Sequence, residues 1–93
     1  MPARTTPARP ETPVGALWNL SEKTAGWLTE EGIETFADLC EADLIGVWIS
    51  LKVKHRQVTR LMYYALWGAR HDCHWRSITE ADKARFEAAL AQR

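Results

Sequence analysis

The sequence predicts an all-α fold, a compact bundle of about five short helices with a helical hairpin near the N-terminus. Three observations support this prediction. Apolar residues recur at spacings of three and four along most of the chain, which is the periodicity of a helix face. Residues that cap helix N-termini, Ser21, Thr35 and Thr79, stand directly before three of these segments. No segment alternates apolar and polar residues as a half-buried strand would.

The first fifteen residues differ in composition from the rest. Residues 1–15 hold all four prolines of the chain, together with Thr, Ala and Arg. Because this mixture neither forms a core nor sustains a helix interior, we expect a disordered tail there and one helical domain over residues 16–93. A single hydrophobic core in a domain of that size stabilises the fold by only about 3–5 kcal/mol. Five large side chains add apolar surface to bury: Trp18, Trp27, Trp48, Trp67 and Trp75.

The first helix is expected to begin at Glu22, because the Ser21 hydroxyl can accept a hydrogen bond from the free amides of the first turn. It ends at Gly32, since a chain often leaves a helix through a left-handed residue that glycine adopts without strain. Ile33 is then expected to close back onto Leu28.

The second helix begins within three residues of that end. Thr35 and Asp38 form a pair like a capping box, with Asp in place of the usual Glu. Residues 17–39 therefore form a tight helical hairpin.

Three further helices complete the bundle. Residues 41–53 form a third helix, or continue the second after a break near Ala42. Residues 52–56 form a basic turn, and residues 57–71 carry the strongest helix pattern in the chain. The last helix starts at Thr79, with Asp82 as its capping partner, and runs to about residue 90.

The helix over residues 57–71 has two faces. Its apolar face is Val58, Leu61, Met62, Ala65 and Ala69, and Gly68 permits close approach by a neighbour. A second stripe combines basic and aromatic groups that could stack on single-stranded nucleic acid: Arg60, Tyr64, Trp67 and His71. The alternative, which we favour, is a central helix packed on both sides, with Tyr63 and Tyr64 in the core and the Arg residues reaching solvent.

The hairpin resembles the helix-hairpin-helix motif, a SAM-like arrangement whose usual form opens with Leu-Pro-Gly-Ile-Gly. The matching residues are Leu17, Leu20, Ala25, Leu28, Gly32 and Ile33. In that motif, backbone amides at a helix N-terminus approach a phosphate. Asn19 and Ser21 stand here in place of the two glycines. The resemblance implies phosphate contacts from Asn19, Ser21, Lys23 and Thr24.

From residue 17 to about residue 90 the chain resembles the C-terminal domain of the TfoX/Sxy family of bacterial competence regulators. The resemblance rests on residues in a shared order: Leu17, Asn19, Leu20 and Lys23; Gly32 and Ile33; Tyr64 to Leu66 with Gly68 and Ala69; and Cys73, His74 and Trp75 before a final helix. It implies a compact helical domain, usually behind a separate N-terminal domain, with a role in the control of DNA uptake.

Charge is divided between two halves of a chain whose net charge is zero. Residues 22–43 contain seven acids and one base, whereas residues 44–76 contain six bases and one acid. An acidic hairpin repels a duplex, so any nucleic-acid contact belongs to the second half. The candidate basic and aromatic surface there comprises Lys52, Lys54, Arg56, Arg60, Tyr64 and Trp67.

The sequence gives little support for a catalytic site or a metal site. Four near-consecutive residues, 71–74, include metal-ligand types but cannot easily converge on one ion. Cys73 and His74 are adjacent, so their side chains point apart and do not form a nucleophile with its base. We therefore predict no enzyme activity, no metal, no cofactor and no small-molecule substrate. The longest apolar run, residues 61–69, is too short to span a bilayer. We expect a cytoplasmic location, with Cys40 and Cys73 reduced and partly buried.

These observations favour a non-enzymatic module like the TfoX C-terminal domain, which contacts a protein partner in the control of competence or transcription. A protein partner is favoured over DNA. A helix-hairpin-helix module that binds DNA is the first alternative, and a structural or oligomerisation domain is the second. Because the two halves carry opposite charges, self-association is compatible with the sequence.

Overall fold

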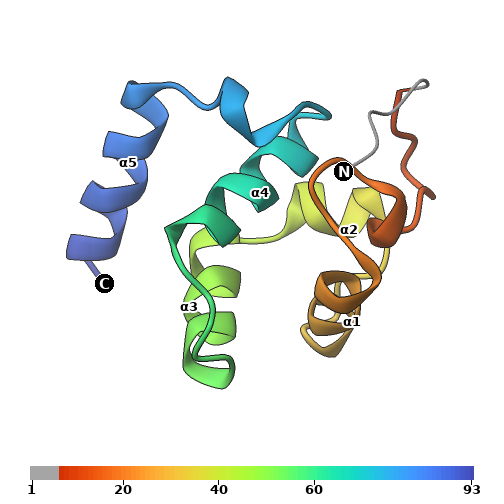
Figure 1. The fold of residues 1–93 in the computed structure, drawn as a ribbon, viewed down its shortest axis with the longest axis horizontal. Helices are drawn as coiled ribbons and strands as arrows, with labels where there is room; N and C mark the ends of the chain where they lie inside the picture. The colour runs from red at the N-terminus through yellow and green to blue at the C-terminus, as the bar shows by residue number, and fades with distance from the viewer. Residues whose placement is uncertain (1–6) are drawn as a thin grey trace.

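The computed structural model describes residues 7–93 and contains five α-helices and no named strand within that range (Figure 1). The helices are α1 (Glu22–Glu30), α2 (Phe36–Glu41), α3 (Leu44–Lys54), α4 (Arg60–Arg70) and α5 (Glu80–Ala91), with short 3-10 helices η1 (Val14–Ala16) and η2 (Trp75–Ser77). α4 lies in the middle, with α1 and α2 to one side and α3 and α5 to the other (Figure 1). The radius of gyration of 12.4 Å is close to the ~12 Å of a compact chain of this length. The all-α prediction is confirmed.

Three predicted helix caps are present. The Ser21 hydroxyl accepts from the Thr24 amide, and the Thr24 hydroxyl accepts from the Ser21 amide, which makes a reciprocal capping box. Thr35 and Asp38 form the same pair at the start of α2. Thr79 accepts from the amide of Asp82 at the start of α5. These local signals fix where three of the five helices begin.

α1 ends at Glu30, and the chain leaves it through the left-handed residue that was predicted, Gly32, which has a φ of +83°. The Ile33 amide donates to the carbonyl of Leu28 at 2.9 Å, and the Gly32 amide donates to that of Thr29 at 3.0 Å. This pair of hydrogen bonds is a Schellman motif, which satisfies two carbonyls that the helix leaves free. It turns the chain directly into α2.

We expect Gly32→Ala to lower the free energy of unfolding by about 1–2 kcal/mol, the cost of a left-handed residue with a Cβ. No atom lies within 4 Å of that Cβ, so the loss is conformational rather than steric. Urea unfolding measures it. Gly32→Asn is the control, since Asn tolerates this conformation and Asn19 adopts it elsewhere in the chain. Equal losses for both variants would contradict this account.

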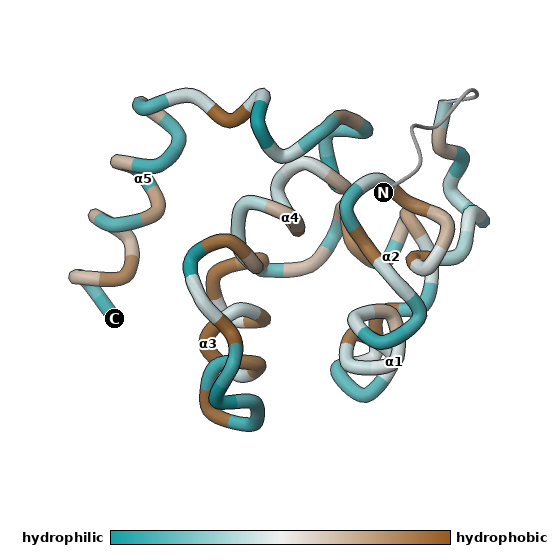
Figure 2. The backbone as a smooth tube through the Cα atoms, viewed as in Figure 1, coloured by the Kyte–Doolittle hydropathy of each residue, from teal (hydrophilic) through white to brown (hydrophobic). Residues whose placement is uncertain are grey.

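The core draws one large, fully buried side chain from each helix: Leu28, Leu39, Leu51, Leu66 and Phe86. Figure 2 shows α3 as the most apolar helix and α5 as largely hydrophilic outside a few positions. A helix as polar as α5 depends on a small number of contacts for its position.

Phe86 supplies the main contact between α5 and the rest of the bundle. Its ring stacks on Tyr63 with centroids 3.8 Å apart and meets Trp48 edge-on at 5.3 Å. Burial raises the pKa of the Tyr63 hydroxyl. Tyr63 therefore belongs to the core, as the packed interpretation of α4 predicted, whereas Tyr64 is only partly buried.

The predicted apolar face of α4 is wrong at Leu61, whose exposed fraction is 48 %. Leu66, which that face omitted, is fully buried instead. Tyr63 packs on Phe86 of α5, and Leu66 is one turn further along the same side of α4, so this side rather than that of Leu61 faces the core.

The prediction of a disordered tail is contradicted for residues 7–15, and residues 1–6 lie outside the described residues. The amides of Phe36 and Ala37 donate to the carbonyls of Thr12 and Pro10 at 2.8 and 3.0 Å. Val14 is buried, with an exposed fraction of 2 %. The first amides of a helix have no partner within it. A proline-rich extended segment can supply carbonyls to them, since proline lacks only the donor.

α2 and α3 are separate helices, divided at Ala42 and Asp43, which confirms the first of the two alternatives for this region and the break near Ala42. The bounds of α3 and α4 differ from those expected. α3 runs on to Lys54, so Lys52 and Lys54 are helical rather than part of a turn. α4 begins at Arg60, three residues later than its apolar pattern suggested.

Candidate interaction groove

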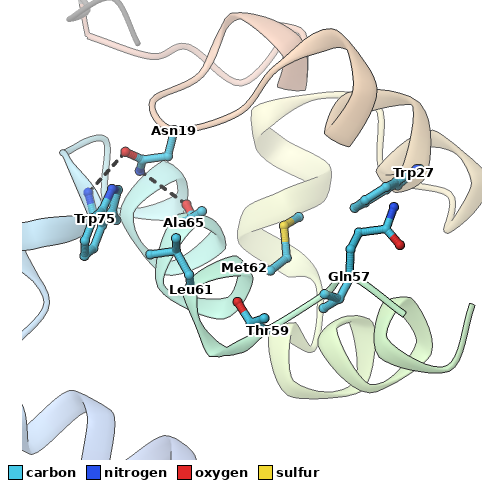
Figure 3. A pocket seen from close by; sticks show the side chains of 9 residues that line it. Asn19, Trp27, Gln57, Thr59, Leu61, Met62, Ala65 and Trp75 are labelled. Carbon is cyan, nitrogen blue, oxygen red and sulfur yellow. Dashed lines mark hydrogen bonds between the residues drawn. The ribbon is translucent and has the colours of Figure 1, made fainter. Parts of the chain in front are cut away.

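A groove of about 240 Å³ opens between α1, the start of α4 and η2 (Figure 3). Apolar side chains from the α4 segment line it: Val58, Leu61, Met62 and Ala65. Trp27 of α1 and Trp75 of η2 lie at opposite ends in Figure 3. We call this feature the Trp27–Trp75 groove.

One contact holds the indole of Trp27, and another holds the backbone that carries Trp75. Trp27 stacks on His55, with ring centroids 4.0 Å apart and planes 14° from parallel. The amide of Trp75 donates to the Asn19 side-chain oxygen at 3.1 Å. Because these contacts hold the Trp27 ring and the Trp75 backbone, the groove is formed without a ligand.

Positive charge lies at both ends of the groove. The Lys23 ammonium is 5.4 Å from the Trp27 ring centre, and the Arg76 guanidinium is 5.6 Å from the Trp75 ring centre. Arg56 is exposed and directly precedes Gln57, which lines the groove. Within residues 7–93 none of these three cations forms an ion pair.

The four residues proposed for phosphate contact all have intramolecular roles in the structure. Asn19 is buried at 8 % exposure, and its amide nitrogen donates to the carbonyls of Ala65 and Cys73 at 3.3 and 3.1 Å. Ser21 and Thr24 cap α1. Lys23 faces Trp27. Asn19, which stands where the helix-hairpin-helix motif has a glycine, adopts the left-handed conformation that glycine favours, with a φ of +68°.

The predicted basic and aromatic surface is largely occupied by intramolecular contacts. Lys52 donates to the Val58 carbonyl at 2.7 Å, Lys54 pairs with Glu31 at 2.6 Å, and Arg60 makes two contacts with Glu87. Arg56 alone of the four predicted cations is free of an ion pair or hydrogen bond in the described part of the chain.

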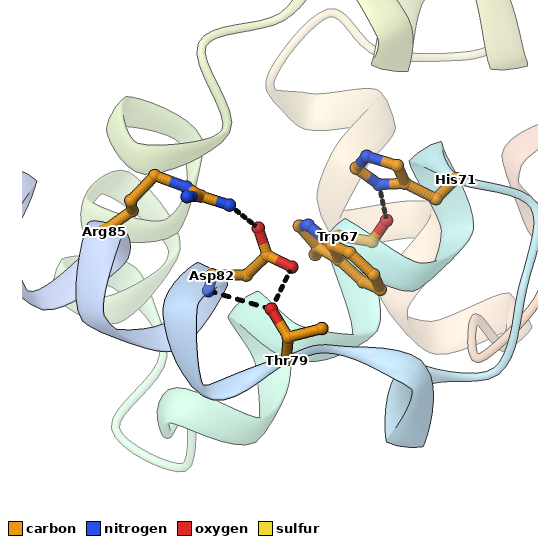
Figure 4. Close-up of polar contacts among 5 residues, drawn as sticks. All are labelled: Trp67, His71, Thr79, Asp82 and Arg85. Carbon is orange, nitrogen blue, oxygen red and sulfur yellow. Dashed lines mark hydrogen bonds and ion pairs between the residues drawn. The ribbon is translucent and has the colours of Figure 1, made fainter.

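The aromatic members of that surface, Tyr64 and Trp67, lie on α4. Trp67 stacks on His71 at 4.2 Å, and the His71 ring nitrogen Nδ1 lies 2.8 Å from the Trp67 carbonyl (Figure 4). Tyr64 has the Lys83 ammonium 5.2 Å from its ring centre. The start of α5, with Thr79, Asp82 and Arg85 hydrogen-bonded together, appears in the same view. The three α4 members of the predicted surface, Arg60, Tyr64 and Trp67, are therefore each engaged by another side chain of the domain.

Comparison with known proteins places this architecture in a family. The sequence matches the profile of the TfoX C-terminal domain over residues 11–90. The chain belongs to the TfoX C-terminal domain family. The match starts at residue 11, inside the segment that packs on α2. No curated protein matched in a sequence search.

A solved structure shares the fold of this TfoX C-terminal domain. It is the crystal structure of an uncharacterized protein from Listeria monocytogenes, in a triclinic form. The two chains are 22 % identical and superpose with a TM-score of 0.73, over 82 % of this chain and 86 % of the other. At this identity the likeness establishes the fold alone.

Ion pairing lowers the pKa of Glu31 in this TfoX C-terminal domain, chiefly through the hydrogen bond from Lys54. A carboxyl with a lowered folded pKa stabilises the fold above its ordinary pKa, and this contribution is lost as the pH falls through the folded value. The pair ties the end of α1 to the end of α3.

We expect Lys54→Met to raise the Glu31 pKa toward its ordinary value and to lower stability at neutral pH more than at pH 3. An NMR titration of the Glu31 carboxyl and urea unfolding at both pH values measure these effects. Arg56→Met is the matched control, since it removes an exposed cation that forms no ion pair in the described residues. A Glu31 pKa unchanged by Lys54→Met would contradict the assignment.

Metal and redox sites are not evident in the part of the chain that the structure describes. No three residues among its His, Cys, Asp and Glu are arranged to hold a metal ion. Cys40 and Cys73 are free and partly buried, as predicted. In residues 7–93 no helix combines the length and the apolar character needed to cross a membrane.

The groove itself was missed by the sequence analysis, which assigned Leu61, Met62 and Ala65 to one buried face. Ala65 is small, and a small side chain leaves space beside a helix rather than fills it. That feature of the α4 sequence was the available signal.

Proposed function

We propose that this TfoX C-terminal domain is a non-enzymatic protein-interaction module with a regulatory role in DNA transformation or transcription. Family membership supports the regulatory role. The observation that carries the preference for a protein partner is the occupation of the predicted DNA-binding cations. Lys52, Lys54 and Arg60 are each bound within the domain, whereas an apolar groove is open to solvent.

DNA binding through the hairpin is the less favoured alternative. Binding to a duplex requires several cations that are free to neutralise phosphates. The helix-hairpin-helix mode also needs bare backbone amides at the α1 N-terminus. Here the Ser21 and Thr24 side chains cap that end, and Asn19 is buried. Glu22 adds a negative charge in the first turn.

A fluorescence-anisotropy titration against duplex and single-stranded DNA tests this preference. We expect binding no tighter than the ~10⁻⁴ M at the weak end of non-specific association, with little change between wild-type protein and a Lys54→Glu/Arg56→Glu variant. Lys23→Glu tests the hairpin in the same assay. Micromolar binding that falls steeply with salt and is lost in one variant would replace the protein-partner proposal with a DNA module.

The regulatory role needs a separate measurement. Deleting the encoding gene from its own organism and restoring it should change transformation frequency, or the transcript levels of DNA-uptake genes. No change in either quantity would remove the link to competence and transcription.

A further inference from the structure

The Trp27–Trp75 groove has the size and lining of a site for one large apolar side chain. Its volume of about 240 Å³ lies below the ~300–1,000 Å³ typical of pockets for small molecules and cofactors. Leu61 forms part of its lining and remains 48 % exposed in the free domain. Exposed apolar surface beside a preformed hollow is typical of peptide and protein contact sites.

The charges around the groove indicate the chemistry of the segment that presents this side chain. Lys23 and Arg76 lie at its two ends, and neither has a carboxylate partner in residues 7–93. The first turn of α4 contains no acid, and its N-cap residue Thr59 makes no side-chain cap. A helix N-terminus carries partial positive charge, so it adds to the same sign. Electrostatic complementarity therefore favours an acidic segment.

We propose that the Trp27–Trp75 groove binds a short peptide segment of a partner protein that carries a large apolar side chain flanked by Asp or Glu. This inference rests on the proposed protein-interaction function and names its site and its class of partner. The apolar side chain packs on Met62 and Leu61 between the two indoles, and the acidic residues face Lys23 and Arg76.

A nucleic-acid strand fits the groove less well. Bases bind such proteins by stacking on free aromatic faces. One face of Trp27 is covered by His55 at 4.0 Å, and the α4 side of the groove is aliphatic. The polar edges of a base would be left without partners there.

A second copy of the domain also lacks a suitable segment in its described residues. Its large apolar side chains with high exposure are Val53 and Leu61, and both lie in the basic half. The acidic half, residues 22–43, presents no comparable side chain. Within residues 7–93 a second copy therefore offers no such segment, which favours another protein as the source of the apolar side chain.

Selection from a displayed library of random twelve-residue peptides tests the proposal. The library is bound to the wild-type protein after depletion on a Leu61→Glu variant. We expect enriched sequences to combine a Phe, Leu, Trp or Met with neighbouring Asp and Glu. Failure to enrich any sequence, or enrichment of basic ones, would overturn the proposal.

Anisotropy measurements with one enriched peptide locate the contact. We expect Leu61→Glu and Lys23→Glu/Arg76→Glu each to weaken binding about tenfold or more, as for residues at the centre of an interface. Val53→Glu is the matched control, since it places the same charge on an exposed residue of α3 that does not line the groove, and we expect a change below about twofold. Leu61→Ser, which adds no charge, should also weaken binding. Thermal melts establish that every variant is folded.

The outcomes separate this inference from the proposed function. Peptide binding that is unaffected by Leu61→Glu and Leu61→Ser would overturn the groove assignment and leave a protein-interaction module in place. Competition by a twelve-residue oligothymidylate at low salt, sensitive to Leu61→Glu, would instead assign the groove to single-stranded nucleic acid. Salt-dependent duplex binding in the separate DNA titration would reject the proposed function itself.

Discussion

We expect Gly68→Ala to lower the free energy of unfolding by about 3 kcal/mol, at the upper end of the cost of overpacking a close contact. A Cβ on Gly68 would lie 2.5 Å from the Asn19 side-chain nitrogen, 2.8 Å from the Cys73 carbonyl oxygen and 3.1 Å from the Trp75 Cα. Two of these neighbours are backbone atoms, so the clash cannot be relieved by rotating a side chain. Either the turn into η2 moves or the Asn19 hydrogen bonds lengthen.

The chain provides a matched control for this substitution at Gly26. Gly26 is exposed within α1, and an added Cβ meets no atom within 4 Å. Gly26→Ala should therefore stabilise the protein by about 0.5–1 kcal/mol, because alanine loses less conformational entropy in a helix. Urea unfolding should therefore show a loss of stability for Gly68→Ala and a gain for Gly26→Ala, although both substitutions add one methyl group. If Gly68→Ala lowered the free energy of unfolding by less than about 1 kcal/mol, η2 would not be held against α4 as described.

Features set by neighbouring residues were predictable from the sequence. Ser21, Thr35 and Thr79 were assigned as caps because a capping hydrogen bond spans only three residues. Gly32 was assigned as a helix end because a chain often leaves a helix through a left-handed glycine, which is also a local feature. The close approach at Gly68 was also anticipated, although the sequence could not say which segment approaches. It is the Cys73–Trp75 turn, together with Asn19 from far earlier in the chain.

Features set by contacts between distant segments were not predictable in the same way. The proline-rich segment was assigned to a disordered tail on composition, yet its carbonyls meet the free amides of α2 more than twenty residues along the chain. The packing of Tyr63 on Phe86 of α5 joins residues more than twenty positions apart, and the burial of Leu66 and exposure of Leu61 could not be read from the apolar pattern of α4 alone. The ion pairs of the basic half were not predicted, since no local pattern pairs Lys54 with Glu31 or Arg60 with Glu87.

Asn19 shows how a residue of a motif can serve the fold instead of a ligand. The helix-hairpin-helix resemblance placed it at a phosphate contact. In the structure its side chain joins three backbone groups, the carbonyls of Ala65 and Cys73 and the amide of Trp75. It therefore connects the loop before α1 to α4 and to η2. A single buried amide group holds one wall of the Trp27–Trp75 groove in place.

We expect Asn19→Ala to lower the free energy of unfolding by about 4 kcal/mol. Loss of three hydrogen bonds accounts for about 3 kcal/mol at about 1 kcal/mol each. The left-handed conformation at a φ of +68° adds at least about 1 kcal/mol once the side chain no longer compensates for it.

Asn19→Gly separates these two contributions, because glycine adopts the left-handed conformation without strain and also lacks the hydrogen bonds. The difference between the two variants in urea unfolding should therefore be about 1 kcal/mol, with Asn19→Gly the more stable. In both variants the Trp75 amide loses its acceptor, so its hydrogen exchange should accelerate more than that of the Ile33 amide, which bonds to Leu28 within the hairpin. If the Trp75 amide stays as protected as in the wild type, η2 is held by contacts other than Asn19, and the groove does not depend on this residue for its shape.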